Sequence, residues 1–222
     1  MNKKIKVILT GATGMVGEGV MHECLQHPDI EEVLIINRKP YGVSHPKLRE
    51  LLLPDFFELS SLKGKLEGYD ACLFCLGVSS VGMKEPEYTR LTYTLTLHFA
   101  EELLRQNKTM TFSYISGKST DSTEKGKMMW ARVKGKTEND LMKLSFQGVY
   151  AFRPGFMKPT PGLRNTLPAY KYISWMYPFL KLILPNTATT LAELGQAMIQ
   201  VSLKGYEKQV IEVKDILVLA KG

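Results

Sequence analysis

The sequence predicts an α/β fold, a doubly wound parallel sheet with a small C-terminal cap. Three features of the 222 residues predict it: apolar, β-branched runs recur, segments of helical length separate most of them, and a glycine-rich turn follows the first run. Strands that alternate with helices form crossover units, which build a parallel sheet covered on both faces. Continuously apolar strands agree with this fold, because both faces of such a sheet are buried.

Apolar runs along the chain are expected to be the strands of this sheet. The first run is rich in β-branched residues and ends at a glycine turn, as a buried strand does. The expected strands cover residues 5–9, 33–36, 48–53, 71–76, 110–115, 149–152 and 210–213.

The helices are expected where apolar residues return every three or four positions, as at Leu91, Leu95, Phe99 and Leu103. The clearest helical segments are 15–26, 88–106 and 128–146, and a last helix is expected near 191–203.

Prolines are spaced through residues 154–190, which predicts an irregular cap on the main sheet, with 156–190 as the substrate region. The chain shows no fixed repeat, low-complexity tract or dividing linker, so residues 1–222 are expected to form a single domain.

Composition excludes several classes of protein. The chain has 29 Lys and Arg against 22 Asp and Glu, a net charge of +7, and 44% hydrophobic residues, which is typical of a globular domain and not of a disordered or collagen-like chain. Three cysteines favour a reducing compartment, and we expect a cytoplasmic protein. The positive charge could attract nucleic acid, an anionic membrane or a phosphorylated ligand, and composition alone does not choose among them.

No membrane span or leader is expected. The apolar start is interrupted by Lys6 and is too short for a signal peptide, so a first strand is favoured. Residues 172–184 contain Pro178 and Lys181 and are shorter than the roughly 20 residues that span a bilayer. Their aromatic residues could form an amphipathic anchor in a membrane interface, but a helix that closes a substrate pocket is favoured.

A glycine motif follows the first strand and opens the first helix. It reads Thr10-Gly11-Ala12-Thr13-Gly14-Met15-Val16-Gly17. Glycines permit a tight turn and close approach of the backbone to a pyrophosphate, and the helix N-terminus offers free N–H groups and a positive dipole end. With a second strand about twenty residues further on, this context predicts a Rossmann dinucleotide site. The residues expected to contact the cofactor here are Gly11, Thr13, Gly14, Met15, Val16 and Gly17.

The end of the second strand favours the phosphorylated cofactor, NADP(H), over NAD(H). A site for NAD places Asp or Glu here to hold the ribose hydroxyls, whereas this chain has Asn37 and Arg38, and both are expected to contact the cofactor. Arg38 can stack on adenine or pair with a 2′-phosphate. The alternative is that Arg38 and Lys39 are solvated surface charges.

With these motifs the chain resembles the short-chain dehydrogenase/reductase superfamily. The resemblance is to its extended or atypical branch, which includes Tat-interacting-protein-like oxidoreductases and sugar-nucleotide-epimerase-like proteins. It covers residues 5 to about 157 through the glycine spacing and four further motifs: Cys75-Leu76-Gly77, Ile115-Ser116-Gly117, Lys134-Gly135-Lys136-Thr137-Glu138 and Arg153-Pro154-Gly155. The resemblance implies cofactor contacts at Cys75, Leu76, Gly77, Lys134, Pro154 and Gly155.

In that family a Ser, a Tyr and a Lys perform the chemistry, and the resemblance assigns Ser116 and Lys134 to two of these roles. The Tyr position, four residues before Lys134, is Trp130. An indole N–H donates a hydrogen bond but does not titrate in water, so Trp130 cannot be a general acid or base. A substitute acid could be Tyr114, Tyr88, Tyr93 or a C-terminal tyrosine, although a buried structural role is favoured for each.

Other clusters are interpreted as structural. Cys72 and Cys75 should point to opposite faces of a strand, and the four histidines lack ligand spacing, so no metal is expected. The basic loop near Lys125 lacks interleaved aromatics, so no nucleic-acid partner is expected. The sequence thus favours an NADP(H)-dependent oxidoreductase or epimerase-like enzyme for a small carbonyl or alcohol. The alternative is a dinucleotide-binding sensor that has lost its general acid.

Overall fold

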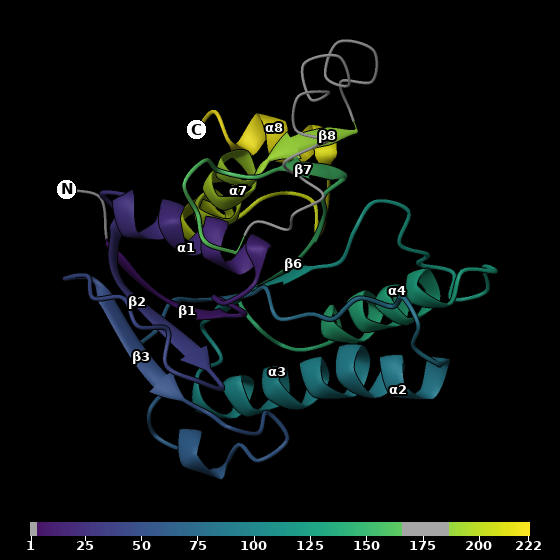
Figure 1. Ribbon diagram of the computed structural model, residues 1–222, viewed down its shortest axis with the longest axis horizontal. Helices are drawn as coiled ribbons and strands as arrows, with labels where there is room; N and C mark the ends of the chain where they lie inside the picture. The colour runs from purple at the N-terminus through teal and green to yellow at the C-terminus, as the bar shows by residue number, and fades with distance from the viewer. Residues whose placement is uncertain (1–3, 166–186) are drawn as a thin grey trace.

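A seven-stranded parallel sheet forms the centre of the protein in the computed structural model, which describes residues 4–165 and 187–222 (Figure 1). The strand order is β3-β2-β1-β4-β5-β6-β9, and every neighbouring pair is parallel. The strands are β1 (Ile5–Thr10), β2 (Ile30–Asn37), β3 (Leu48–Leu52), β4 (Ala71–Phe74), β5 (Thr111–Ile115), β6 (Gly148–Arg153) and β9 (Val210–Glu212). The predicted fold class is confirmed. The order reverses between β1 and β4, and ligands bind outside the carboxyl ends of the strands at such a point.

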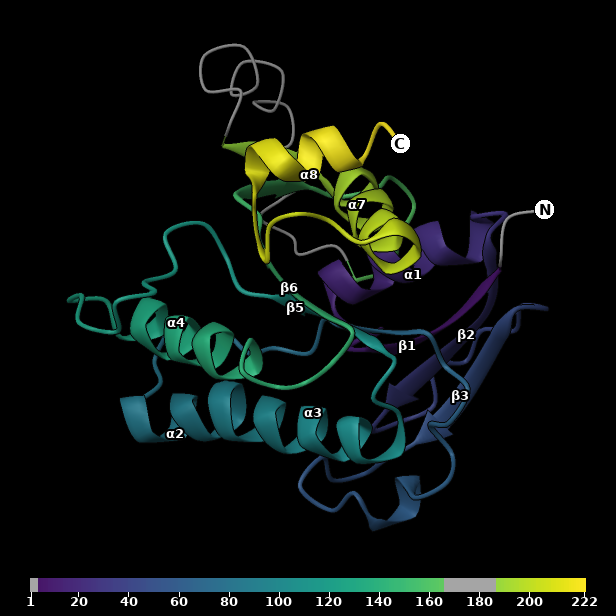
Figure 2. The same ribbon diagram turned by 180° about the vertical axis from the view of Figure 1, so that it is seen from behind.

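Helices cover both faces of this sheet (Figures 1 and 2). One face carries α1 (Met15–Gln26), α7 (Leu191–Lys204) and α8 (Val213–Leu219), and the other carries α2 (Glu85–Thr89), the π-helical turn η2 (Arg90–Thr94), α3 (Leu95–Gln106) and α4 (Met129–Leu141). Alternate residues of β1 face opposite cores: Val7 and Leu9 pack with the α1 and α7 side, and Ile8 packs with the α3 side. This alternation follows from the two-residue period of a strand.

Several predicted element bounds differ from the structure. The single helix expected from residue 88 begins at Glu85 and contains the π turn η2, while the helix expected to reach residue 146 ends at Leu141. A short helix, α8, was not predicted, because its apolar residues continue the run of β9. It begins where Glu212 and Asp215 form a capping box, which satisfies N–H groups that a helix start leaves unpaired.

The expectation of an irregular region from residue 154 to 190 was wrong at its two ends. Strands β7 (Phe156–Lys158) and β8 (Ala188–Thr190) pair in parallel as a second, two-stranded sheet. Gly155 makes this pairing possible, because a Cβ at that position would lie 2.0 Å from the carbonyl oxygen of Thr187. Residues 166–186, where the pocket-closing helix or interfacial anchor was expected, lie outside the described residues. In the described part of the chain no helix is both long and apolar enough to cross a membrane.

Candidate dinucleotide site

The glycine turn between β1 and α1 lies at the point where the strand order reverses. Gly11 has a φ of +76°, and a Cβ there would lie 2.7 Å from the backbone carbonyl carbon of Cys75, which follows β4. A Cβ on Gly17 would lie 2.1 Å from the carbonyl oxygen of Gly11. The two glycines therefore let the turn lie directly against β4 and let α1 lie directly against the turn.

Gly14 is the N-cap of α1, and no side chain caps the helix. Its N–H donates to the Gly11 carbonyl at 2.9 Å, and Thr13 and Gly14 are exposed. The first N–H groups of a helix have no intrahelical partners, so those after Gly14 are available to an anion. Met15, Val16 and Gly17 follow Gly14 in this first turn.

Glu18 is a buried acid in the same turn of α1, and its carboxylate is held by protein groups. It accepts the backbone N–H of Arg164 at 2.9 Å and of Asn165 at 2.7 Å, and the Tyr41 hydroxyl donates to it at 3.3 Å. Burial and the Glu18 charge raise the pKa of Tyr41 to about 12. Glu18 thus ties residues 164 and 165 to the helix that begins at the glycine turn.

Two cavities lie between the glycine turn and the ends of β2, β3 and β4. A cavity of about 540 Å³ is lined by Thr13, Arg38, Lys39 and Pro54. A second, of about 270 Å³, is lined by Arg38, Pro54, Asp55, Phe56, Phe57, Leu76, Gly77, Val78, Arg90, Leu91 and Leu95. Arg38 is exposed and lines both cavities.

Asn37 lies at the carboxyl end of β2 but uses its side chain within the protein. Its Nδ2 donates to Glu50 Oε1 at 3.0 Å, and the same oxygen accepts the Tyr41 N–H at 2.8 Å. Asn37 is buried. The structure therefore brings Arg38, and not the Asn37 amide, to the cavities.

The second cavity includes residues that sequence reasoning missed. The stretch from Pro54 to Phe57 follows β3, and the rule that ligands bind beyond the carboxyl ends of strands could have identified it. Arg90 could not be found in this way. Its guanidinium carbon lies 4.5 Å from the centroid of the Phe57 ring, a stacking arrangement that only the tertiary structure shows.

Cys75, Leu76 and Gly77 lead away from β4 beside the glycine turn. The Leu76 N–H donates to Thr10 Oγ1 at 3.3 Å, and Gly77 has open space where a Cβ would lie. Burial raises the pKa of the Cys75 thiol to about 12, so it is not a reactive thiolate. Cys72 packs in the core beside α3, and Cys75 packs against the opposite core, as expected for residues three apart on a strand.

Ser116 and Lys134 come together at the carboxyl end of β5. Lys134 reaches over from α4, and its Nζ donates to the Ser116 carbonyl oxygen at 2.6 Å and to that of Ile115 at 3.3 Å. The Ser116 hydroxyl donates to the Phe152 carbonyl oxygen at 3.0 Å. Trp130 lies beside them, since a Cβ on Gly117 would be 3.9 Å from its ring.

Burial sets the protonation of the groups around Lys134. It lowers the pKa of the Lys134 ammonium from 10.5 to about 8, against an opposing effect of the Glu138 charge. Tyr114 lies beneath, with its ring centroid 5.9 Å from Nζ, and burial raises its pKa far above 10.

The described tyrosines considered as substitute acids are engaged elsewhere. Tyr114 and Tyr88 are each 2% exposed, and burial raises the pKa of both. Tyr93 donates its hydroxyl to Asp140 at 2.9 Å on α4. None of these three presents a free hydroxyl beside Ser116.

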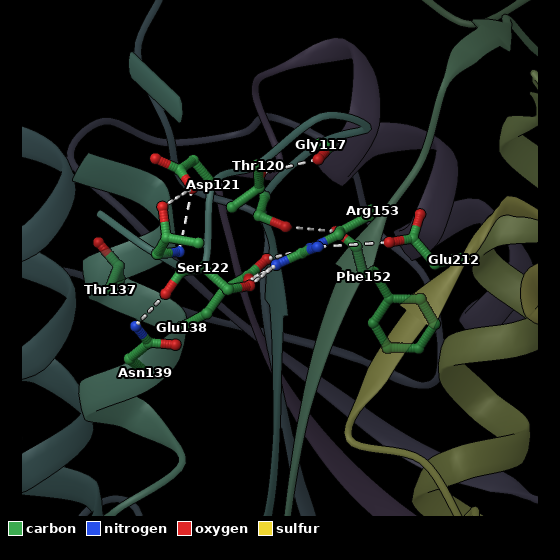
Figure 3. Close-up of polar contacts among 12 residues, drawn as sticks. Gly117, Thr120, Asp121, Ser122, Thr137, Glu138, Asn139, Phe152, Arg153 and Glu212 are labelled. Carbon is green, nitrogen blue, oxygen red and sulfur yellow. Dashed lines mark hydrogen bonds and ion pairs between the residues drawn. The ribbon is translucent and has the colours of Figure 1, made fainter. Parts of the chain in front are cut away.

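A polar network around Arg153 joins four segments of the chain (Figure 3). Arg153 at the end of β6 forms a buried ion pair with Glu138 on α4 and donates to Ser122 Oγ at 2.5 Å. Its third contact, to Glu212 at 3.3 Å, reaches the end of β9. The next residues, Pro154 and Gly155, follow directly, and the Pro154 carbonyl accepts the Lys118 N–H at 2.9 Å.

Within residues 4–165 and 187–222, no three His, Cys, Asp or Glu side chains are grouped so that they could hold a metal ion.

Comparison with known proteins identifies the family. Residues 7–126, more than half of the chain, match the model of the NAD dependent epimerase/dehydratase family, and the protein belongs to that family. The resemblance to extended short-chain dehydrogenases and reductases is thereby confirmed.

Solved structures share the fold at low sequence identity. The enzyme WbmF of Bordetella bronchiseptica, in complex with NAD+, matches with a TM-score of 0.67 and 14% identity over 99% of this chain and 77% of its own. A glucuronic acid dehydrogenase from Chromohalobacter salexigens matches with a TM-score of 0.67 and 14% identity over 93% of this chain and 75% of its own.

A relative of similar length is 23% identical over 98% of this chain and 95% of its own. It is protein FMP52, mitochondrial, of Candida albicans. The name of that relative places it in mitochondria. The cytoplasmic location of this chain stays a prediction.

Proposed function

We propose that this protein is an NAD(P)(H)-dependent oxidoreductase, or an epimerase-like enzyme, that acts by hydride transfer on a small carbonyl or alcohol metabolite. The observation that carries the proposal is the meeting of Lys134 and Ser116 at the end of β5, on the edge of the sheet where the glycine turn also lies. Membership of the NAD dependent epimerase/dehydratase family supports it.

The residues present fit a dinucleotide. The start of α1, which no side chain caps, offers N–H groups to a pyrophosphate. The cavity lined in part by Leu76 and Gly77 offers apolar surface to a base. When bound, the cofactor would supply or accept the hydride. The described residues that line the 540 Å³ cavity include the cations Arg38 and Lys39 and no acid, which supports NADP over NAD.

The protein's own residues orient the reactants in this proposal. Lys134 holds the end of β5 and would lie beside the nicotinamide ribose, and the Ser116 hydroxyl oxygen would accept a hydrogen bond from a substrate hydroxyl. Pro154 and Gly155, after β6, would border the nicotinamide. Trp130 flanks the same space and supplies no proton.

Cofactor binding tests the proposal first. Purified protein is titrated with NADPH and, separately, with NADH, following nicotinamide fluorescence. We expect tighter binding of NADPH, and we expect Arg38→Ala to weaken NADPH binding by about tenfold while leaving NADH nearly unchanged, since it removes one contact to a charged phosphate. Arg105→Ala is the matched control, because Arg105 pairs with Glu102 at the end of α3. If neither NADPH nor NADH binds, the proposal is ruled out.

Trp130 supports a second candidate, a catalytically lapsed dinucleotide sensor that acts through a partner protein. Trp130→Tyr separates the two. A lapsed enzyme would regain carbonyl reduction with the phenol in place, because Lys134 lies one helical turn away to lower its pKa. A site that uses another acid would gain little or lose activity.

A further inference from the structure

We propose that Lys134 itself exchanges the proton with the substrate oxygen, in the role that a tyrosine phenol would otherwise fill. The inference deepens the proposed oxidoreductase function and rests on it. Lys134 thus becomes a catalytic residue as well as a residue that holds the end of β5.

The first support is the position of Nζ. Two of its N–H groups are directed to the carbonyl oxygens of Ser116 and Ile115, which fix the ammonium at the carboxyl edge of the sheet. An ammonium has three N–H bonds. The third is left for an oxygen bound beside Ser116, where the substrate carbonyl is proposed to lie.

The second support is that the neighbouring groups are unsuited to the task. Trp130 has an indole N–H that does not titrate. The Ser116 proton is directed to the Phe152 carbonyl. The Tyr114 hydroxyl is enclosed in the core, so a substrate cannot reach it without unpacking β5 from its helices.

The charges that face Lys134 allow an acid active near neutral pH. Burial lowers its pKa to about 8. Glu138, one turn along α4, opposes this shift, but its carboxylate is paired with Arg153 from β6. From β5 the facing group is Tyr114, with Tyr88 of α2 beyond it, and both phenols stay neutral because burial raises their pKa.

The proton balance of a reduction follows. The substrate carbonyl carbon gains a hydride from the reduced dinucleotide, and the electron pair of the C=O π bond moves to the oxygen. That oxygen takes a proton from Lys134: an N–H bond breaks and an O–H bond forms. Lys134 is left as a neutral amine and regains a proton from water, and oxidation of an alcohol runs in reverse. The protonated form dominates below pH 8, so reduction should slow as pH rises through about 8.

A direct titration tests the inference without any turnover. Protein with 15N-labelled lysine is titrated by NMR, and the Lys134 signal is identified by its loss in Lys134→Arg. Lys136 is the internal control, because it lies on the same helix and its hydrogen bond to Asp140 raises its pKa. We expect Lys134 to titrate near pH 8 and Lys136 above 10.5. Titration of Lys134 at 10 or higher would overturn the inference.

The second measurement follows NADPH oxidation with 4-nitrobenzaldehyde as the carbonyl probe. Lys134→Arg keeps the positive charge but cannot release a proton. We expect it to bind NADPH within a few-fold of the wild type and to reduce the probe at least about 100-fold more slowly. Lys136→Arg should reduce it at the wild-type rate, and Trp130→Tyr should gain little.

The outcomes separate the inference from the proposed function. Failure to bind NADPH, or binding without reduction at any pH, refutes the oxidoreductase and the inference with it. Reduction by Lys134→Arg with the wild-type rate and pH profile overturns the inference alone, and the oxidoreductase then uses another acid.

Discussion

Arg153 and Glu138 form a buried ion pair that joins the end of β6 to the last turn of α4 (Figure 3). Arg153 Nε donates to Glu138 Oε1 at 3.0 Å, and a second N–H group donates to Oε2. Glu138 is 1% exposed and Arg153 is 9% exposed. Since Lys134 lies one turn before Glu138 on the same helix, this pair helps to fix the position of Lys134 against β5.

Breaking this pair should be costly. Glu138→Gln leaves a buried guanidinium without its counter-charge, and we expect the free energy of unfolding to fall by about 3–5 kcal/mol. The comparison is Glu102→Gln, which breaks the more exposed pair with Arg105 and should cost about 1 kcal/mol or less. Urea unfolding measures both. Equal losses in the two variants would contradict the assigned importance of the buried pair.

The free energy of unfolding should depend on the protonation of Lys134 at alkaline pH. Its folded pKa of about 8 lies below the value of 10.5 expected in the unfolded chain, so between these pH values the unfolded state binds more protons. Stability contributed by this residue therefore rises as pH increases through that window. The Lys134→Arg variant stays charged throughout.

The free energy of unfolding of the wild type minus that of Lys134→Arg should accordingly increase from about pH 7.5 to about pH 10. The difference cancels other titrating groups, including the buried tyrosines. A flat difference would show that Lys134 titrates normally.

Two constraints act on Gly11 in the glycine turn, a positive φ and a close backbone neighbour, and two variants separate them. Gly11→Ala meets both a positive φ and the Cys75 backbone at 2.7 Å, so we expect loss of NADPH binding and a destabilisation well above 2 kcal/mol. Gly64→Ala has a φ of +73° but open space around it, and should cost only about 1–2 kcal/mol. Urea unfolding and NADPH fluorescence report the two effects. Equal losses of unfolding free energy in Gly11→Ala and Gly64→Ala would contradict the close approach of the turn to β4.

The stacked pair Arg90 and Phe57 should contribute to nucleotide binding. Phe57→Leu removes the ring beneath the guanidinium at the cavity wall, and we expect affinity for 2′,5′-ADP to fall about two- to fivefold. Tyr93→Leu is the control, because Lys136 stacks on Tyr93 at 4.8 Å outside this cavity. Calorimetric titration gives both affinities. Unchanged binding by Phe57→Leu would place the base elsewhere.

Local patterns predicted the sheet and the first helix well. The bounds of α1 match the prediction because the glycine turn, the apolar spacing and the following polar residues all lie within the segment itself. The prediction failed where the structure depends on distant partners. Strands β7 and β8 are three residues each and owe their pairing to Gly155 and Thr187, and Asn37 turns to Glu50 on another strand.

The candidate site divides in the same way. The family resemblance assigned Lys134, Ser116 and Trp130 to the candidate site, and the structure brings them together at the end of β5. The buried partner of Glu138 is an arginine that follows it by fifteen residues, and only the fold brings the two together.

The parallel pairing of β7 with β8 has an evolutionary consequence. The two strands hold each other through this pairing and through the close approach of Gly155 to Thr187. They form a sheet of their own, which shares no strand with the seven-stranded sheet. Substitutions in these two strands can therefore accumulate among descendants without shifting the register of the main sheet.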